Sequence, residues 1–234
     1  MRTSGVGDIE HTELDPDRPA GNQIFLSLRD AILNMELPPG CTLSESEIGL
    51  RFGASRTPVR SALTQLREQG LIVTRPSRGN YVAKLSEKKI RAAQFIRECL
   101  ELGIVRRLCE YGIPEKDDEK LTAVLERQRQ AIEDPEKFDF YKQDEAFHNG
   151  LATATGMEQV HLLYKREMAD LGRLRHLGMD DEAHKKQLLS EHLTMLNAIR
   201  ERDRERAEAV MQTHVRCVLG KLSGLMNANQ DFFA

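Results

Sequence analysis

Four side chains in the C-terminal half of the chain have the types and the spacing of metal ligands. Asp144 and His148 are four residues apart, so on a helix they share one face, which is otherwise apolar. His192 and His214 each interrupt a further apolar repeat at helical spacing. A single histidine on such a face is usually a satisfied core residue. Four polar groups on the inner faces of three helices would each cost about 1–3 kcal/mol if unpaired, and one bound cation would satisfy them all.

The donor set narrows the identity of this cation. Three imidazole nitrogens and one carboxylate oxygen suit a borderline divalent ion, Zn²⁺ or Ni²⁺, and Mn²⁺ is also compatible because of the carboxylate. Such a set leaves one or two coordination positions open for water or a ligand. The remaining histidines lie in the N-terminal tail or among charged neighbours, and we expect them to be solvated: His11, His161, His176 and His184.

A buried arginine is predicted near the same candidate metal site. Arg97 lies on the apolar stripe that also contains Ala93, Ile104 and Leu108. An arginine that faces a cavity can hold a carboxylate through two parallel hydrogen bonds. The alternative is a salt bridge to Glu101 on the same helix, and the sequence alone leaves the two open.

Helices must position these residues. From residue 85 to the C-terminus the apolar pattern is nearly continuous at helical period, and glycine, proline or polar residues interrupt it at five places. This predicts an antiparallel all-helical bundle of about six helices. The expected helices are 86–111, 115–133, 136–154, 157–177, 180–201 and 204–227.

A second constellation lies nearer the N-terminus and is strongly basic. Seven Lys or Arg and one acidic residue lie between Leu50 and Lys84, whereas the whole chain has a net charge of −3. A domain that binds a polyanion concentrates cations on one face. The pattern predicts a helix to Phe52, a turn at Gly53, a second helix to about Gln69, and a small hairpin.

This arrangement is a winged helix-turn-helix, in which the second helix reads DNA bases with its N-terminal residues. Arg56, Thr57 and Arg60 are at that end and are expected to face solvent, and arginine can hold guanine through two hydrogen bonds. Arg75 and Arg78 are at the hairpin tip. A preceding amphipathic helix from Asn22 to about Glu36 would support the motif.

Residues 22–84 resemble the DNA-binding domain of the GntR family of bacterial transcription regulators. The likeness is in PPG, in LSESEIGLRFGASRTPVRSALTQLREQGLI and in the RG of the wing. It implies operator contacts at six positions, and at one of them, Ser46, the family often has arginine. The implied contact residues are Ser46, Ser55, Arg56, Thr57, Arg60 and Gly79.

Residues 86–225 resemble the FCD effector domain of FadR-type GntR regulators, which has an Asp-x3-His pair and two later histidines around a metal. The resemblance implies that the metal ligands are Asp144, His148, His192 and His214, and that Arg97 holds the acid group of an effector. Six helices rather than seven are closer to the smaller, VanR-like branch.

Length and composition agree with a two-domain, mainly α protein. The 234 residues are 30% charged and 5% aromatic, which suits a mostly helical soluble chain. Residues 1–21 are polar and acidic, which predicts a mobile tail, followed by a DNA-binding domain at 22–84 and an effector and dimerisation domain at 85–234. No apolar run suggests a membrane span or a secretory signal, so we expect a cytoplasmic protein. Four scattered cysteines suggest reduced, structural thiols.

These features predict a metabolite-responsive transcription regulator, most simply a repressor. It would bind a palindromic operator as a homodimer and leave it when a small carboxylate binds. Two alternatives remain at this point. One is a metal-dependent hydrolase domain fused to a DNA-binding module, although there is no HExxH helix and no clearly placed general base. The other is a purely structural metal with no effector.

Overall fold

The computed structural model describes residues 6, 13–167, 169–177 and 181–234, and these divide into two compact units. The N-terminal unit comprises Met1–Glu87, Gly172–His176 and Met226–Ala234. The helical unit comprises Lys88–Leu171 and Leu177–Leu225. The fold is mainly α, with a winged helix-turn-helix followed by an all-helical part, which confirms the predicted fold class.

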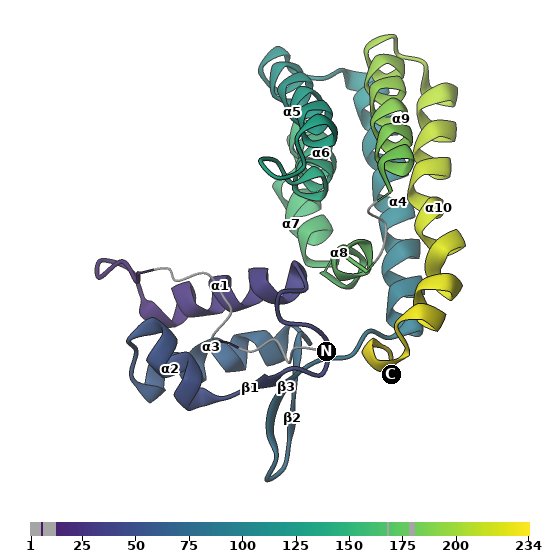
Figure 1. Cartoon of the computed structure of the whole chain (residues 1–234). Helices are drawn as coiled ribbons and strands as arrows, with labels where there is room; N and C mark the ends of the chain where they lie inside the picture. Colours follow the sequence, from purple (N-terminus) through teal and green to yellow (C-terminus); the bar gives the residue numbers. More distant parts are fainter. Residues whose placement is uncertain (1–5, 7–12, 168, 178–180) are drawn as a thin grey trace. The chain divides into compact units, whose positions relative to one another are not determined.

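The N-terminal unit has a helix-turn-helix with a three-stranded sheet (Figure 1). The strands are antiparallel in the order β1-β3-β2, with Arg75 paired to Gly79 at the hairpin end. Helix α1 packs on α3, and the core between them includes Ile24, Leu28 and Leu63. The elements are α1 (Ala20–Leu33), β1 (Thr42–Leu43), α2 (Glu45–Phe52), α3 (Arg56–Glu68), β2 (Ile72–Arg75) and β3 (Gly79–Val82).

Local chemistry sets the helix boundaries in this motif. The Ser44 side chain accepts a hydrogen bond from the backbone N–H of Glu47, so it caps α2. Gly53 ends that helix in the left-handed conformation (φ 59°), which glycine adopts without steric cost. Ser55 precedes α3 in an extended conformation, but its side chain makes no capping hydrogen bond.

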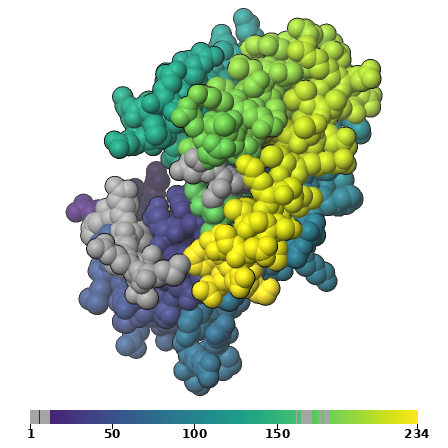
Figure 2. All heavy atoms as spheres, turned by 45° about the vertical axis from the view of Figure 1, so that its right-hand side comes forward, coloured from purple at the N-terminus to yellow at the C-terminus, as the bar shows by residue number. Residues whose placement is uncertain are grey.

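The helical unit contains long helices that pack side by side, as α9 and α10 do in Figure 2. Ion pairs between Arg106 and Glu208 and between Arg216 and Glu98 join α4 to α10. The helices after the wing are α4 (Glu87–Tyr111), α5 (Glu115–Glu133), α6 (Phe140–Ala154), α7 (Glu158–Glu167), α8 (Ala169–Arg175), α9 (Glu182–Arg200) and α10 (Arg204–Ala228). The ends of α8 and α10 belong to the N-terminal unit.

Several details differ from the sequence-based expectations. The expected helix at 157–177 covers α7 and α8, and these two segments are divided at residue 168, which lies outside the described residues. Helix α6 begins at Phe140 rather than residue 136, because the Asp139 side chain caps it through the N–H groups of Tyr141 and Lys142.

Two further expectations concern the N-terminal residues and membrane-spanning helices. Residues 1–5 and 7–12 of the predicted mobile tail at 1–21 lie outside the described residues, and α1 already begins at Ala20. Among the described residues, no helix has both the length and the apolar character that crossing a membrane requires.

Candidate metal centre and nucleic-acid interface

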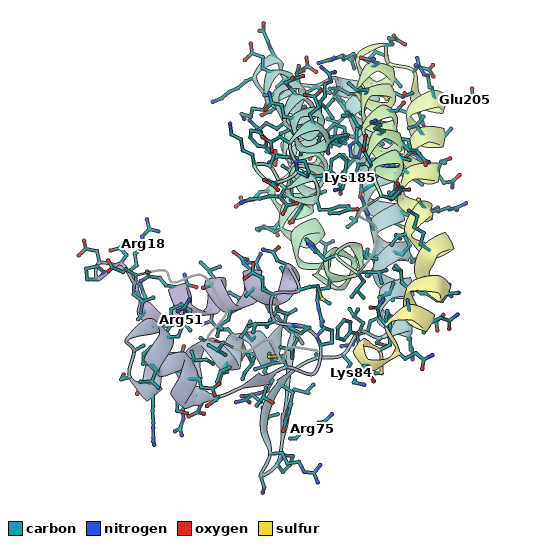
Figure 3. The ribbon with its side chains drawn as sticks, in the orientation of Figure 1. Arg18, Arg51, Arg75, Lys84, Lys185 and Glu205 are labelled. Carbon is teal, nitrogen blue, oxygen red and sulfur yellow. The ribbon has the colours of Figure 1, made fainter. Side chains whose placement is uncertain are left out.

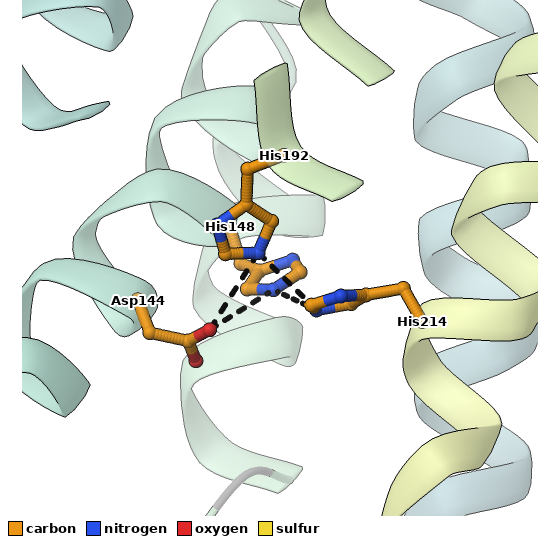
Figure 4. A group of neighbouring side chains, drawn as sticks. All are labelled: Asp144, His148, His192 and His214. Carbon is orange, nitrogen blue, oxygen red and sulfur yellow. Dashed lines mark hydrogen bonds and ion pairs between the residues drawn. The ribbon is translucent and has the colours of Figure 1, made fainter. Parts of the chain in front are cut away.

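The four predicted ligands come together inside the helical unit (Figure 4). Asp144 and His148 project from α6, His192 from α9 and His214 from α10. All four are buried, and one ligand atom of each lies within 4.8 Å of the others. His214 Nε2 lies 3.1 Å from His148 Nε2 and 3.2 Å from His192 Nε2. Asp144 Oδ1 is 3.5 Å from His192 Nε2.

Each imidazole is oriented by an acceptor at its other ring nitrogen. A carboxylate or amide oxygen faces every Nδ1, which assigns the ring proton to Nδ1 and leaves a lone pair on Nε2. Metal-ligating histidines are usually held in this way. The pairs are Glu101 with His148, Gln128 with His192 at 2.9 Å, and Glu191 with His214 at 2.8 Å.

This tautomer assignment shows that the residues fit a divalent ion. Three Nε2 lone pairs that face one another cannot hydrogen-bond to one another. That of His148 meets a donor, Arg97 Nη2 at 2.9 Å, and one shared cation would satisfy all three. Adjacent ligands around an ion at about 2.1 Å stand about 3.0–3.4 Å apart, and the two Nε2 separations of 3.1 and 3.2 Å match that spacing. The Asp144 carboxylate supplies a negative charge on the same side.

The protonation states favour the same conclusion. Burial lowers the pKa of His148 to about 4 and holds the pKa of His192 well below its ordinary value. Both rings are therefore neutral near pH 7 and can offer their lone pairs to a metal. Burial alone would raise the pKa of Glu101, but the Arg97 guanidinium and the hydrogen bond from His148 outweigh it, so this carboxylate stays ionised.

Arg97 forms the salt bridge to Glu101 that the sequence left open as one alternative, and it also contacts a candidate ligand histidine. It is buried, its Nε donates to Glu101 Oε1, and its Nη2 lies 2.9 Å from His148 Nε2. One turn earlier on α4, the side-chain amide of Gln94 is also buried, and neither its oxygen nor its nitrogen has a partner among the described residues. The Arg97 guanidinium and the Gln94 amide, whose hydrogen-bonding capacity is open, therefore share the inner face of α4.

The predicted nucleic-acid surface lies on the N-terminal unit. All eight predicted contact residues are exposed: Ser46, Ser55, Arg56, Thr57, Arg60, Arg75, Arg78 and Gly79. A groove of about 420 Å³ lies between α3 and the hairpin and brings Arg60, Arg75 and Gly79 to one surface. Figure 3 shows Arg75 projecting from the hairpin. Glu45 from α2 forms an ion pair with Arg60 at 3.0 Å, so the side chain of Arg60 is oriented before any DNA is bound.

Comparison with known proteins decides the family. Residues 20–82 match the bacterial regulatory proteins of the gntR family, and residues 94–216 match the FCD domain. The chain belongs to the GntR family. It is a transcription regulator with an FCD domain, which confirms the resemblance that the sequence motifs indicated.

Relatives along the whole chain support this assignment. The HTH-type transcriptional repressor RspR of Escherichia coli K12 is 34% identical over 223 residues, which are 95% of this chain and 97% of RspR. The HTH-type transcriptional regulator LutR of Bacillus subtilis is 30% identical and covers 85% of this chain and 99% of its own length. Both relatives are named transcription regulators, which supports a regulator rather than a metal-dependent hydrolase.

Solved structures share the fold. Escherichia coli McbR/YncC has a TM-score of 0.75 at 19% sequence identity, covering 89% of this chain and 98% of its own. A GntR transcriptional regulator from Rhodococcus sp. RHA1 has the same TM-score at 21% identity, covering 87% and 97%.

Sequence reasoning missed several residues of the regulator's candidate metal centre. Gln128 lies on α5, and Glu191 adjoins His192 on α9, where adjacent positions point about 100° apart, so neither is expected at the ligands from spacing. The Glu191 side chain nevertheless reaches His214. His184 was expected to be solvated and is instead buried, since it lies two turns before His192 on the inner face of α9. That eight-residue spacing was the signal that could have revealed it.

Replacing Glu191 with alanine is expected to weaken divalent-metal binding by about 10- to 100-fold, because His214 loses the acceptor that orients its ring. Glu145→Ala is the matched control: Glu145 adjoins Asp144 in sequence, but it is exposed. Competition with a chromogenic chelator measures both affinities. Equal affinities for the two variants would mean that Glu191 does not orient a ligand.

Proposed function

We propose that this GntR-family regulator is a metal-containing repressor that leaves its operator when a small carboxylate binds in the FCD domain. The observation that carries the proposal is the convergence of three Nε2 lone pairs, the Asp144 carboxylate and the Arg97 guanidinium in one buried place. We propose Asp144, His148, His192 and His214 as the ligands of a divalent ion, with Zn²⁺ or Ni²⁺ preferred and Mn²⁺ compatible. The metal would supply positive charge and open coordination positions to an anionic ligand.

Arg97 is the proposed anchor of the effector's acid group. Its Nη2 now lies against His148 Nε2, the atom that would coordinate the metal. Once that lone pair is used in coordination, Arg97 Nη2 is available to donate to a carboxylate, while Nε stays on Glu101. The open amide of Gln94, one turn away, supports a ligand that bears both a carboxylate and a second polar group.

One recognition helix reads only a few base pairs, so we propose a homodimer on a palindromic operator, acting in the cytoplasm. The proposed DNA contacts are the eight exposed residues on α2, α3 and the hairpin. RspR and the Salmonella schwarzengrund NanR, which is 30% identical over 211 residues, are both named repressors, which supports repression rather than activation.

An effector titration tests the proposal. The operator is selected from random duplexes by the wild-type protein, and its release is measured with benzoate, lactate and gluconate as an aromatic, a hydroxy and a sugar acid. Arg97→Lys keeps a charge beside Glu101 but loses the two-pronged donor geometry. We expect about 10- to 100-fold weaker release by the active acid, with metal content and operator affinity unchanged.

Arg216→Lys serves as the matched control, because Arg216 also pairs with a glutamate of α4 but is exposed. The structural-metal alternative makes a different prediction: chelation would lower the melting temperature, while no acid would change operator affinity. An equal response in wild type and Arg97→Lys would remove Arg97 from the effector site.

A further inference from the structure

The linker that follows the wing is held on several sides within the N-terminal unit. Ala83 N donates to Leu71 O at 2.8 Å, and Ala83 O accepts from Arg173 Nη2 at 2.6 Å. Arg173 lies on α8 and has no exposed surface. Burying a guanidinium is costly unless its donors are used, so the bond to Ala83 is a specific contact rather than a surface one.

The C-terminal residues form hydrogen bonds with Lys84 and Leu85, the next residues of the linker. Leu85 pairs with Phe233 as a parallel bridge, with Leu85 N donating to Phe232 O and Ala234 N donating to Leu85 O, both at 2.9 Å. Lys84 Nζ also donates to Phe233 O at 3.2 Å, and Figure 3 shows Lys84 beside the C-terminal segment. Leu85 and Phe233 are both buried. The chain end is thus bonded to the linker through its backbone.

We propose that Arg173 and residues 232–234 form a linker clamp that determines which operator half-site spacing the dimer accepts and carries the effector signal to the DNA-binding motif. This inference rests on the proposed homodimer and effector response. Without the clamp, Ala83–Leu85 would be a short free tether. With it, the linker backbone is bonded to two segments that come from far along the chain.

Covalent continuity ties these segments to the metal centre. Helix α10 carries His214 and runs on to Ala228, four residues before the bonds to Leu85 begin. Helix α4 starts at Glu87, two residues after Leu85, and carries Arg97 and Glu101. A shift of either helix when ligand binds in the bundle therefore moves one side of the bridge between Leu85 and Phe233. A recognition helix attached through a rigid linker has a fixed orientation, and a fixed orientation selects half-site spacing.

Two variants test the clamp, and each removes a different part of it. Deleting Phe232–Ala234 removes the bridge, and Arg173→Gln removes the bond to Ala83 O. Arg106→Gln is the matched control, because it removes an exposed arginine that pairs with Glu208. Operator affinity is measured on the selected operator and on duplexes with one base pair added to or removed from the spacer. Metal content and thermal melting report folding.

The clamp predicts altered selectivity with retained binding. We expect the deletion to keep its metal and to bind the selected operator, while its preference over the altered spacers falls by about fivefold or more. The release caused by benzoate, lactate or gluconate, whichever acts on wild type, should weaken by a similar factor. Amide hydrogen exchange across residues 83–90 should also accelerate.

Unchanged spacing preference in the folded deletion variant would overturn the clamp. If Arg173→Gln does not fold, the deletion decides alone, because residues 232–234 contribute no ligand to the metal centre. If none of the three acids releases the wild-type protein, the proposed effector response fails for those acids, whereas the spacing comparison still decides whether the clamp exists.

Discussion

Replacing His192 with alanine will remove stoichiometric divalent metal from the regulator. His192 is fully buried at the centre of the cluster, with Nε2 directed at His214 and Asp144 and Nδ1 held by Gln128. The wild-type protein should retain about one ion per chain after dialysis, because a four-ligand set of this type binds tightly. Elemental analysis of both dialysed proteins gives the result directly.

The same loss should appear in thermal stability. Free metal at 100 times its dissociation constant adds about 2.7 kcal/mol to the free energy of unfolding. For a chain of 234 residues, this corresponds to a rise of about 5–11 °C in the melting temperature. Chelation should therefore lower the melting temperature of the wild-type protein by that amount. It should leave the melting temperature of the His192→Ala variant unchanged.

His184→Ala provides a closely matched control for this experiment. Both histidines are buried on α9, so each alanine removes a buried ring, but only His192 belongs to the cluster. His184→Ala should melt at a lower temperature and still respond to chelator. A His192→Ala protein that keeps one tightly bound ion, or a wild type that binds none, would contradict the metal centre.

Replacing Arg60 with alanine will weaken specific operator binding by about 1–3 kcal/mol, roughly five- to 150-fold. Arg60 is exposed on the recognition helix α3 and lines the groove beside the hairpin, where its ion pair with Glu45 orients it. An arginine that forms two hydrogen bonds with a guanine contributes discrimination between DNA sequences. A scrambled duplex should therefore lose much less affinity than the operator. Fluorescence anisotropy at one fixed salt concentration measures both.

Arg18→Ala is the control for this prediction. Arg18 is also an exposed arginine in an ion pair, with Asp15, but it lies outside the predicted DNA surface. Its removal should change operator affinity little. Operator affinity that stays the same in Arg60→Ala, or that falls equally for the scrambled duplex, would show that Arg60 does not read a base.

Much of the fold was predictable because helical periodicity is a local property. The expected helix at 115–133 matches α5, and the expected helix at 204–227 differs from α10 by one residue. Strand β1 was missed, since two residues carry no readable period and this strand exists only through its pairing with β3. The start of α6 was placed four residues early, because the capping role of Asp139 depends on its backbone geometry.

The candidate metal centre was likewise predictable from the sequence only in part. Asp144 and His148 share one face by spacing alone, and their helical period predicted that they would face inward. The acceptors on the ring nitrogens lie on three helices, Glu101 on α4, Gln128 on α5 and Glu191 on α9, with no common spacing to the rings that they orient. The burial of His184 was missed because its neighbours in sequence are charged, although its eight-residue spacing to His192 places both rings on one face of α9.

By itself, the sequence determined the family, the two kinds of domain, the basic recognition helix and four residues suited to one metal. These follow from local spacing and from motifs, which any reader of the chain can measure. Only the tertiary structure decided that the three imidazoles point their lone pairs at one another, that Arg97 reaches His148 while bonded to Glu101, and that the chain end bonds to the linker. Those contacts join residues that are 51, 66 and 148 positions apart, and packing of the whole chain, rather than any local preference, brings such residues together.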